Sequence, residues 1–276
     1  MPHVGFMVPS IAPDATATST VEYARRAEAL GAHSVWVPDR IVYPSPDIFV
    51  TLGALAAATE RVRIGSAVVL GILRPPVLIA KAASTLSALS DGRFVLGLGV
   101  GSRAEDFRSV DVPIEERGKR MRELVQLLKR EQPTLPLWFG GRADAVLKRT
   151  ARFGDGYIGS TSGGVDGFLV RWQQIQRYAA EAGRDPATIT PAALIHFSLD
   201  SDRDRARSAM HAYLSHSYGP ERAADLGNMV GAADDLVRGA EAYFGAGVEL
   251  LIVSSITARL HHLEAFGDRV LRRLPV

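Results

Sequence analysis

The alternation of apolar and polar stretches is clearest between residues 61 and 101. An apolar, β-branched run over residues 62–70 is followed by Pro75-Pro76 and by a helical pattern that continues to Leu89. A second apolar run, residues 94–98, ends in glycines. Neither run carries a polar residue at every second position, as a strand with one face in water would. The segment therefore predicts a βαβ unit in a parallel sheet that is covered on both faces.

Similar units occur along the whole chain. Strands are predicted over residues 4–8, 34–37, 62–70, 94–98, 137–139, 156–160, 189–199 and 248–254. Helices are predicted over residues 18–30, 48–59, 80–89, 116–130, 143–153, 165–182, 202–216 and 233–244, with a closing helix that ends at 273. Residues 102–115 are predicted to form a loop, and residues 218–231 an irregular excursion.

Eight strands separated by helices predict an α/β fold, a single closed (β/α)8 or TIM barrel that takes in residues 1–276 as one domain. A chain of 276 residues suits this fold, which typically needs about 250. An open, doubly wound parallel sheet is the alternative, because right-handed crossovers build both architectures.

The composition excludes several classes of protein. The net charge is only +2 and no long Lys/Arg run occurs, so nothing supports nucleic-acid binding. No apolar stretch reaches the roughly 18 residues of a membrane span, and the first residues lack the pattern of a signal peptide. The absence of cysteine excludes disulfides and thiolate catalysis and fits a reducing compartment, so we expect a cytoplasmic protein.

In a barrel of this kind, ligands bind at the carboxyl ends of the strands. The residues predicted to surround this mouth are 9–10, 39–40, 65–70, 99–105, 140–142, 160–164, 196 and 254–255. Most of them are uncharged, so a small-molecule ligand is the expected partner.

Two glycine turns carry the strongest local signal. Gly140-Gly141 stands between a predicted strand and a helix whose first turn leaves N–H groups that favour an anion. The sequence Gly99-Val100-Gly101 follows the neighbouring strand, although it lacks the third glycine of a dinucleotide fingerprint. Together they predict a phosphate site on the rim. The alternative is that each merely makes a tight turn.

Several ordered segments carry a resemblance to a known family. They are WVPDR at 36–40, RIGSAVVLGILRPPVLIAKAASTLSALSDGRFVLGLGVG at 63–101, PIEERGKRMRE at 113–123, LWFGGRADAVLKRTARFGDGYIG at 137–159 and VGAADDLVRGAEAYFGAGVELLIV at 230–253. Together they resemble the bacterial luciferase-like superfamily, which comprises flavin-dependent monooxygenases and oxidoreductases that use the deazaflavin coenzyme F420.

The resemblance implies a cofactor site. In this family the third strand bulges against the cofactor ring, in many members through a non-proline cis peptide, and the matching bond here is Ala67–Val68. The implied cofactor contacts are Trp36, Ser66, Ala67, Val68, Val100, Gly101, Ser102, Gly140, Gly141, Arg142 and Ser160. Coenzyme F420 is preferred over FMN because the chain is short and lacks the long insertion of the two-component monooxygenases.

Two departures from the family pattern leave the reaction class open. Several relatives carry a histidine after the aspartate of the second strand, where this chain has Arg40. The sugar-phosphate-oxidising F420 relatives carry a glutamate where this chain has Ser102, which argues against a sugar-phosphate substrate. The same acid–base mechanism is therefore in doubt.

The candidate catalytic residues are Asp39, Arg40 and His196. Asp39 and Arg40 could form an ion pair that orients a substrate, or a strand-end pair with a structural role only. Arg40 could stabilise an anion but hardly act as a base. His196 could face the ring as a proton donor or be a buried core histidine. Glu105 and Asp106 are expected to be solvated loop acids, and no metal site is predicted.

The function predicted is F420-dependent hydride transfer to or from a small organic substrate. The alternatives are an FMN-dependent monooxygenase, a non-catalytic cofactor-binding or partner protein, and a metal-free barrel lyase or isomerase. Family habit suggests a homodimer packed through helices near the second and third strands, which the apolar face of residues 52–58 would permit. Neighbouring helices could equally cover that face in a monomer.

Overall fold

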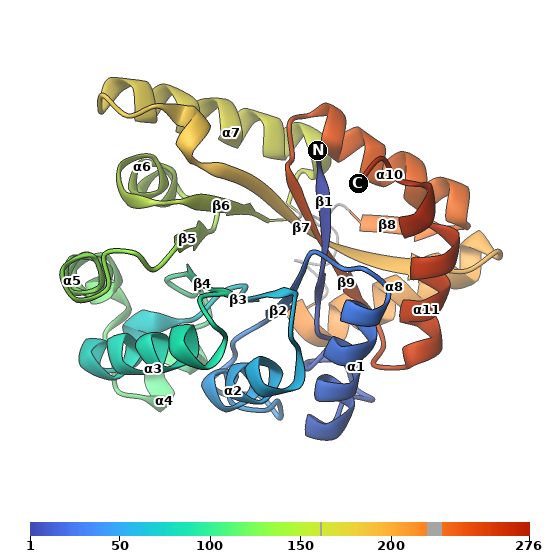
Figure 1. Cartoon of the computed structure of the whole chain (residues 1–276), viewed down its shortest axis with the longest axis horizontal. Helices are drawn as coiled ribbons and strands as arrows, with labels where there is room; N and C mark the ends of the chain where they lie inside the picture. Colours follow the sequence, from blue (N-terminus) through green and yellow to red (C-terminus); the bar gives the residue numbers. More distant parts are fainter. Residues whose placement is uncertain (161, 220–227) are drawn as a thin grey trace.

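A ring of parallel strands surrounded by helices forms the centre of the structure, a computed structural model that describes residues 1–160, 162–219 and 228–276 (Figure 1). Each strand from β1 to β6 pairs with the next, β6 also pairs with β7, and β9 joins β7 to β1. These eight strands close a (β/α)8 barrel. The predicted TIM barrel is confirmed, and the open sheet is excluded.

The sheet contains one strand more than predicted. The strands are β1 (His3–Met7), β2 (Ser34–Val37), β3 (Arg63–Ser66), β4 (Phe94–Leu98), β5 (Leu137–Gly140), β6 (Gly156–Gly159), β7 (Thr190–Leu199), β8 (Asn228–Gly231) and β9 (Leu250–Ser255). Among the described strands, β8 pairs with the end of β7 alone, in parallel register from His196 to Leu199, and so lies outside the barrel.

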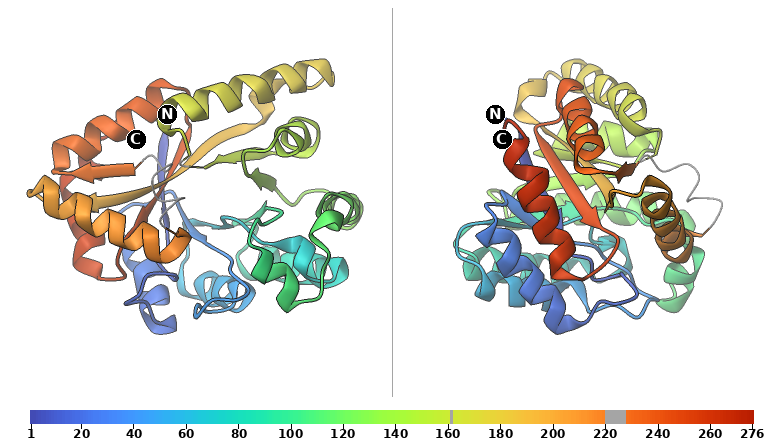
Figure 2. Two further views of the ribbon diagram at one scale, coloured as in Figure 1. Left: turned by 180° about the vertical axis from the view of Figure 1, so that it is seen from behind. Right: turned by 90° about the vertical axis from the view of Figure 1, so that its right-hand side faces the viewer.

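Helices cover the outside of the barrel, as two further views show (Figure 2). They are α1 (Ala17–Ala29), α2 (Ile48–Ala58), α3 (Pro76–Leu89), α4 (Ala104–Ser109), α5 (Arg117–Glu131), α6 (Asp144–Phe153), α7 (Gly164–Glu181), α8 (Arg203–Tyr218), α10 (Ala233–Gly245) and α11 (Leu260–Arg269). Several begin at a capping side chain: Asp47 accepts from two N–H groups of α2, and Asp202 from two of α8.

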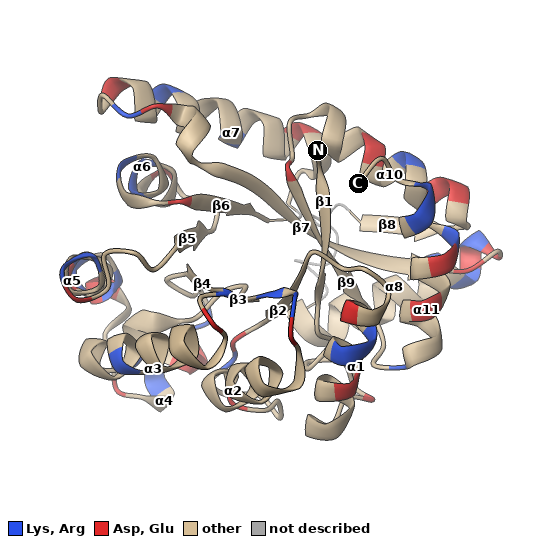
Figure 3. Ribbon diagram, viewed as in Figure 1, with Lys and Arg blue, Asp and Glu red and all other residues tan. Residues whose placement is uncertain are grey.

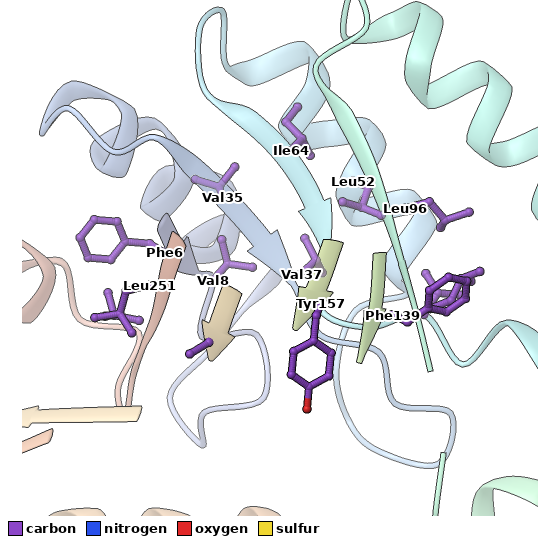
Figure 4. Close-up of a cluster of buried hydrophobic side chains, with 14 of the residues drawn as sticks. Phe6, Val8, Val35, Val37, Leu52, Ile64, Leu96, Phe139, Tyr157 and Leu251 are labelled. Carbon is purple, nitrogen blue, oxygen red and sulfur yellow. The ribbon is translucent and has the colours of Figure 1, made fainter. Parts of the chain in front are cut away.

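Alternate residues of the strands build two separate cores, which is why the strands are apolar at nearly every position. The larger core lies between strands and helices, and Phe6, Val35 and Phe139 belong to it (Figure 4). The smaller core fills the barrel, with Trp36 and Trp138 at its centre. A strand between two apolar layers needs no polar face.

Two sequence predictions about loops were wrong. Residues 102–115 contain the short helix α4, and Glu105 and Asp106 in its first turn complement the helix dipole. The excursion predicted at 218–231 contains the end of α8 and the strand β8, while residues 220–227 lie outside the described part of the chain. α8 and β8 form an insertion between β7 and α10.

Charged side chains lie mainly on the helices that surround the barrel, and the barrel strands are mostly uncharged (Figure 3). Many of these charges are paired with one another on the surface, as in Arg203–Asp235 and Arg26–Glu264. Within the described ranges, no helix is both long and apolar enough to cross a bilayer.

Candidate functional site

The third strand is interrupted at the mouth of the barrel. Regular pairing of β3 with β2 ends at Ser66, and the chain rejoins the sheet where the Val69 N–H donates to the Gly97 carbonyl at 2.8 Å. Between these points the Ala67–Val68 peptide bond is cis, as the family resemblance predicted. Ala67 and Val68 are both half-buried, so this short bulge borders the open end of the barrel.

The Val68 side chain occupies space that two glycines leave open. A Cβ atom on Gly99 would lie 2.4 Å from Val68 Cγ2, and one on Gly140 would lie 2.7 Å from Val68 Cγ1. Real Cβ atoms do not approach that closely. The two glycines therefore admit the bulge of β3, a role that the sequence interpretation, which assigned them to a phosphate or to a tight turn, did not foresee.

Two predicted cofactor contacts have structural partners instead. Ser66 is buried, and its hydroxyl donates to the Gly97 carbonyl and accepts from the Gly97 N–H, both at 2.9 Å. Trp36 is 1% exposed, donates to Ser34 Oγ at 2.8 Å and lies against Trp138 inside the barrel. It borders a cavity at the opposite, N-terminal end of the strands. These positions do not support direct cofactor contacts.

The glycine turns themselves lie on the rim as expected. Gly101 and Gly141 have φ values of +68° and +140°, a region that L side chains rarely adopt. Val100 is half-buried and Ser102 exposed beside them. Gly141 is further held by Tyr157, whose hydroxyl donates to its carbonyl at 2.9 Å. The backbone at both turns thus adopts conformations that would strain a residue other than glycine at Gly101 and Gly141.

The start of α6 adds an anion-binding geometry next to Gly141. No side chain caps this helix, so N–H groups of its first turn have no side-chain acceptor. Arg142 is exposed at the same turn and donates to Ser162 Oγ at 3.0 Å. Ser160, at the end of β6, has a buried hydroxyl that lacks a hydrogen-bond partner among the described residues. A phosphate here would find both N–H and hydroxyl donors.

Asp39 does not pair with Arg40. Its buried carboxylate forms a two-point ion pair with Arg74, whose Nη2 lies 3.0 Å from Oδ1, and it also accepts from the Leu70 N–H at 2.8 Å. The predicted Asp39–Arg40 ion pair was therefore wrong. One feature of the sequence pointed to the observed partner. Arg74 is the single charged residue in the apolar stretch GILRPP, and a half-buried guanidinium requires a counter-charge. Asp39 fixes the loop after β3.

Arg40 faces a pocket at the mouth. Its Nη2 donates to the Ser217 carbonyl at 3.2 Å, and its guanidinium lies over the rings of Tyr43 and Tyr218 at 5.8 and 5.1 Å from their centroids. The described residues that line this pocket are Arg40, Arg103, Glu105, Ser215, His216, Ser217, Tyr218 and Gly219. The pocket thus lies between the end of β2, helix α4 and the end of α8.

The two acids of α4 differ, because Glu105 is largely solvated, as the sequence suggested, and Asp106 is not. Glu105 pairs with Arg103, whose Nε lies 2.7 Å from Oε1, and this arginine lowers the pKa of the Glu105 carboxyl. Asp106 is 2% exposed and accepts from the Val42 N–H at 3.1 Å. Asp106 therefore ties α4 to the loop after β2 beside the pocket.

His196 lies on the barrel-facing side of β7, next to Ser254 of β9 in register. It is 1% exposed, and its Nε2 is 3.1 Å from the hydroxyl of Tyr218. Burial, and then the charge of Arg40, lower the pKa of His196 to about 4, so the ring is neutral at physiological pH. His196 is therefore a buried histidine, as one of the two sequence alternatives held, and it also contacts a residue of the pocket.

Tyr218 is the residue that sequence reasoning missed. It was assigned to an irregular segment, yet it ends α8 and links His196 to the pocket. No local pattern marks it, because the contact joins positions 22 residues apart through the fold of the insertion. Across residues 1–160, 162–219 and 228–276, no group of three His, Asp or Glu side chains could hold a metal ion.

Comparison with known proteins identifies the family. The profile of the luciferase-like monooxygenase family matches residues 4–131 and 129–248. The chain is 27% identical over 248 residues to 5,10-methylenetetrahydromethanopterin reductase of Methanolobus tindarius, covering 77% of this chain and 75% of that one. It is 31% identical over 220 residues to F420-dependent glucose-6-phosphate dehydrogenase of Kineococcus radiotolerans, covering 67% and 65%.

Solved structures show the same fold at low identity. An F420-dependent secondary alcohol dehydrogenase in complex with an F420-acetone adduct has a TM-score of 0.84 and 19% identity, with 98% of both chains covered. The oxygenating constituent of 3,6-diketocamphane monooxygenase of Pseudomonas putida, in complex with FMN, has a TM-score of 0.77 and 16% identity over 100% of both chains. The profile match confirms the predicted resemblance, and this chain belongs to the luciferase-like monooxygenase family of oxidoreductases.

Proposed function

We propose that this protein is an F420-dependent oxidoreductase that transfers a hydride to or from a small organic substrate. The observation that carries the proposal is the arrangement at the mouth. The half-buried Ala67–Val68 bulge lies beside two glycine turns. The uncapped start of α6 and the Ser160 hydroxyl, which has no partner in the described part of the chain, lie nearby. A planar ring over the bulge and a phosphate on the rim match these features.

The residues would divide the work as follows. Ala67 and Val68 would support one face of the ring, and the amides of the glycine turns, with Arg142 and Ser160, would bind the phosphate. The barrel core beneath, closed by Trp36 and Trp138, excludes water from below. The bound cofactor supplies the hydride chemistry, and the protein positions the substrate against it.

Two observations favour F420 over FMN for this chain. The relative from Kineococcus radiotolerans carries F420 dependence in its name. The solved structure with the higher TM-score of the two above is that of an F420-dependent dehydrogenase. Cytoplasmic location and a single domain over residues 1–276 belong to the same proposal.

A titration of the purified protein with oxidised F420 tests the assignment. We expect saturable quenching or shifting of the cofactor fluorescence, and weaker binding in an Arg142→Gln variant because a charge-assisted contact to the phosphate is lost. An Arg152→Gln variant, at the far end of the same helix, is the matched control. Saturable binding of FMN without binding of F420 would overturn the preference.

An FMN-dependent monooxygenase is the second candidate, supported by the family profile and by the FMN-bound structural neighbour. The same titration separates it, because FMN binding gives a yellow protein and oxygen consumption with a reduced flavin. A protein that binds neither cofactor would instead support a non-catalytic member of the family. Gly140 and Gly141 would accommodate either cofactor, so the geometry at the rim does not distinguish F420 from FMN.

A homodimer through α2 and α3 is also part of the proposal. Leu52, Leu55 and Ala56 of the face predicted from the sequence are buried within the monomer, so neighbouring elements cover it. Other large apolar side chains of α2 and α3 are exposed at 57–74%, namely Val50, Val77, Leu78 and Leu89. Four such residues on adjoining helices suit a subunit contact better than a solvated surface. A Leu78→Glu variant should sediment as a monomer at concentrations where the wild type is a dimer. A wild type that sediments as a monomer would disprove this interface.

A further inference from the structure

Arg171, on α7, binds the loop that follows β6. Its Nη2 donates to the Ser162 carbonyl at 2.8 Å and to the Ser160 carbonyl at 3.3 Å. Gly167 makes this approach possible, because a Cβ atom there would lie 2.7 Å from the Ser162 carbonyl oxygen and 3.2 Å from Arg171 Nη1. The helix and the loop can therefore lie close together, and one guanidinium nitrogen holds two carbonyls of the loop.

Arg171 also lies close to the residue that holds the other turn of the rim. Burial raises the pKa of the Tyr157 hydroxyl, and the positive charge of Arg171 counteracts part of that rise. The same hydroxyl donates to the Gly141 carbonyl at 2.9 Å. Arg171 therefore lies beside both segments where the phosphate is proposed to bind, the glycine turn after β5 and the loop after β6.

A purely structural arginine of this chain is bound differently. The half-buried Arg93 donates four hydrogen bonds of 2.9–3.2 Å to the end of α2 and the residues that follow it. Within the described ranges, Arg171 donates from Nη2, and its buried Nε has no partner. A buried N–H of a charged group without an acceptor costs free energy. Holding the loop does not by itself account for an arginine at this position.

The charge of Arg171 has no carboxylate to neutralise it. Its hydrogen-bond partners are neutral carbonyls, and in the part of the chain that the structure describes no acid forms an ion pair with this half-buried side chain. A charge that is partly removed from water attracts an anion more strongly than one in bulk solvent. The buried Ser160 hydroxyl, which also lacks a partner among the described residues, offers a donor on the same loop.

We propose that Arg171 is a positioning residue for the phosphate of the cofactor. It fixes the loop that carries Ser160, and its unneutralised charge favours an anion at that loop. The inference rests on the proposed function, because the phosphate is that of the proposed cofactor. It goes further in assigning the affinity for the phosphate to a side chain behind the loop, so a ligand without a phosphate should gain nothing from Arg171.

Two ligands that differ at the phosphate test the assignment. Oxidised F420 carries it, and the deazaflavin core, from which the phosphate and everything beyond it have been removed, does not. In fluorescence titrations, Arg171→Gln should weaken F420 binding about tenfold, the effect of losing a charge-assisted interaction, and leave binding of the core within about twofold. A variant that weakens both ligands alike would show a role in folding alone and overturn the proposal.

The Arg171→Lys variant tests the charge. Because only one nitrogen of Arg171 holds the loop carbonyls, lysine can keep both the charge and a donor, so it should recover most of the F420 affinity that glutamine loses. Equal losses in the two variants would overturn the electrostatic role. Arg177→Gln, at an exposed position farther along α7, is the matched control and should bind both ligands as the wild type does. Thermal unfolding of each variant verifies that it is folded.

Inorganic phosphate separates this inference from the proposed function. F420 binding that Arg171→Gln leaves unchanged would keep the proposed function and remove only the role of Arg171. If neither F420 nor its core binds, the proposed function fails. In that case, phosphate binding that is detected by phosphorus NMR and weakened in Arg171→Gln would still support the anion site, and an absence of phosphate binding would overturn it as well.

Discussion

The two ends of the barrel differ in what fills them. At the N-terminal end, the large rings of Trp36 and Trp138 lie 5.2 Å apart between their centroids and close the interior. At the C-terminal end, the Val68 side chain of the third-strand bulge occupies the space that Gly99 and Gly140 leave open. We therefore expect stability to depend mainly on the closed end and ligand binding on the other, as is typical of this fold.

The largest expected effect is at the closed end. Replacing Trp36 with alanine removes a buried ring that contacts Trp138 and lies over Gly65, so the free energy of unfolding should fall by about 3–5 kcal/mol. Urea unfolding followed by circular dichroism measures it. A loss below about 1 kcal/mol would show that the closed end is not the main support of the barrel.

The second largest effect on stability is expected when the pH falls, through the buried His196 at the mouth. His196 has a pKa lowered to about 4 by burial and by Arg40, against 6.5 for an unperturbed histidine. Between these values the unfolded chain binds more protons, so stability is complete above about pH 6.5 and is lost as the pH falls toward 4. The contribution is about 3 kcal/mol at its full extent.

A His196→Gln variant isolates this contribution from those of other titrating groups. Its free energy of unfolding, measured by urea between pH 7 and pH 4, should fall less steeply than that of the wild type. Parallel curves for the two proteins would show that His196 is not kept neutral by the fold. Tyr213 and Tyr218, which contact the ring, are unchanged in this comparison.

A smaller effect is expected from crowding the open end. In a Gly140→Ala variant the new Cβ would lie 2.7 Å from Val68 Cγ1 and displace the bulge, at a cost of about 1–3 kcal/mol in stability. The F420 dissociation constant should rise about tenfold, which equals about 1.4 kcal/mol. Fluorescence titration measures it.

The double variant Gly140→Ala with Val68→Ala provides the control for this prediction. Removing the two Val68 methyl carbons makes room for the new Cβ, so cofactor affinity should return toward that of Val68→Ala alone. Strictly additive losses in the double variant would mean that Gly140 acts on the ligand directly and not through Val68.

The smallest effect is expected at the exposed surface of the closed end. His3 is exposed at the first residue of β1 and stacks on His33, with 4.2 Å between ring centroids. A His3→Ser variant should change the free energy of unfolding by no more than about 0.5 kcal/mol and leave F420 binding unchanged. Altered cofactor binding would link the two ends and contradict the division of roles.

Much of the fold could be predicted from local patterns. Apolar runs of four to ten residues and helical periodicities located all eight strands of the barrel within a few residues of their observed bounds. The cis bond at Ala67–Val68 was predicted by family resemblance and is observed. The strand β8 was missed because four residues that pair with only one neighbour leave a weak signal.

The sequence by itself determined a parallel barrel and its family, and it predicted the end at which ligands bind, because apolar periodicity and glycine turns are local properties of the chain. Only the tertiary structure decided the partners of the charged and polar groups. Asp39 binds Arg74, 35 residues away, and Arg40 binds the carbonyl of Ser217, 177 residues away. Such pairings depend on which loops meet at the mouth, and an ion pair or hydrogen bond leaves no periodic trace in the residues between its ends.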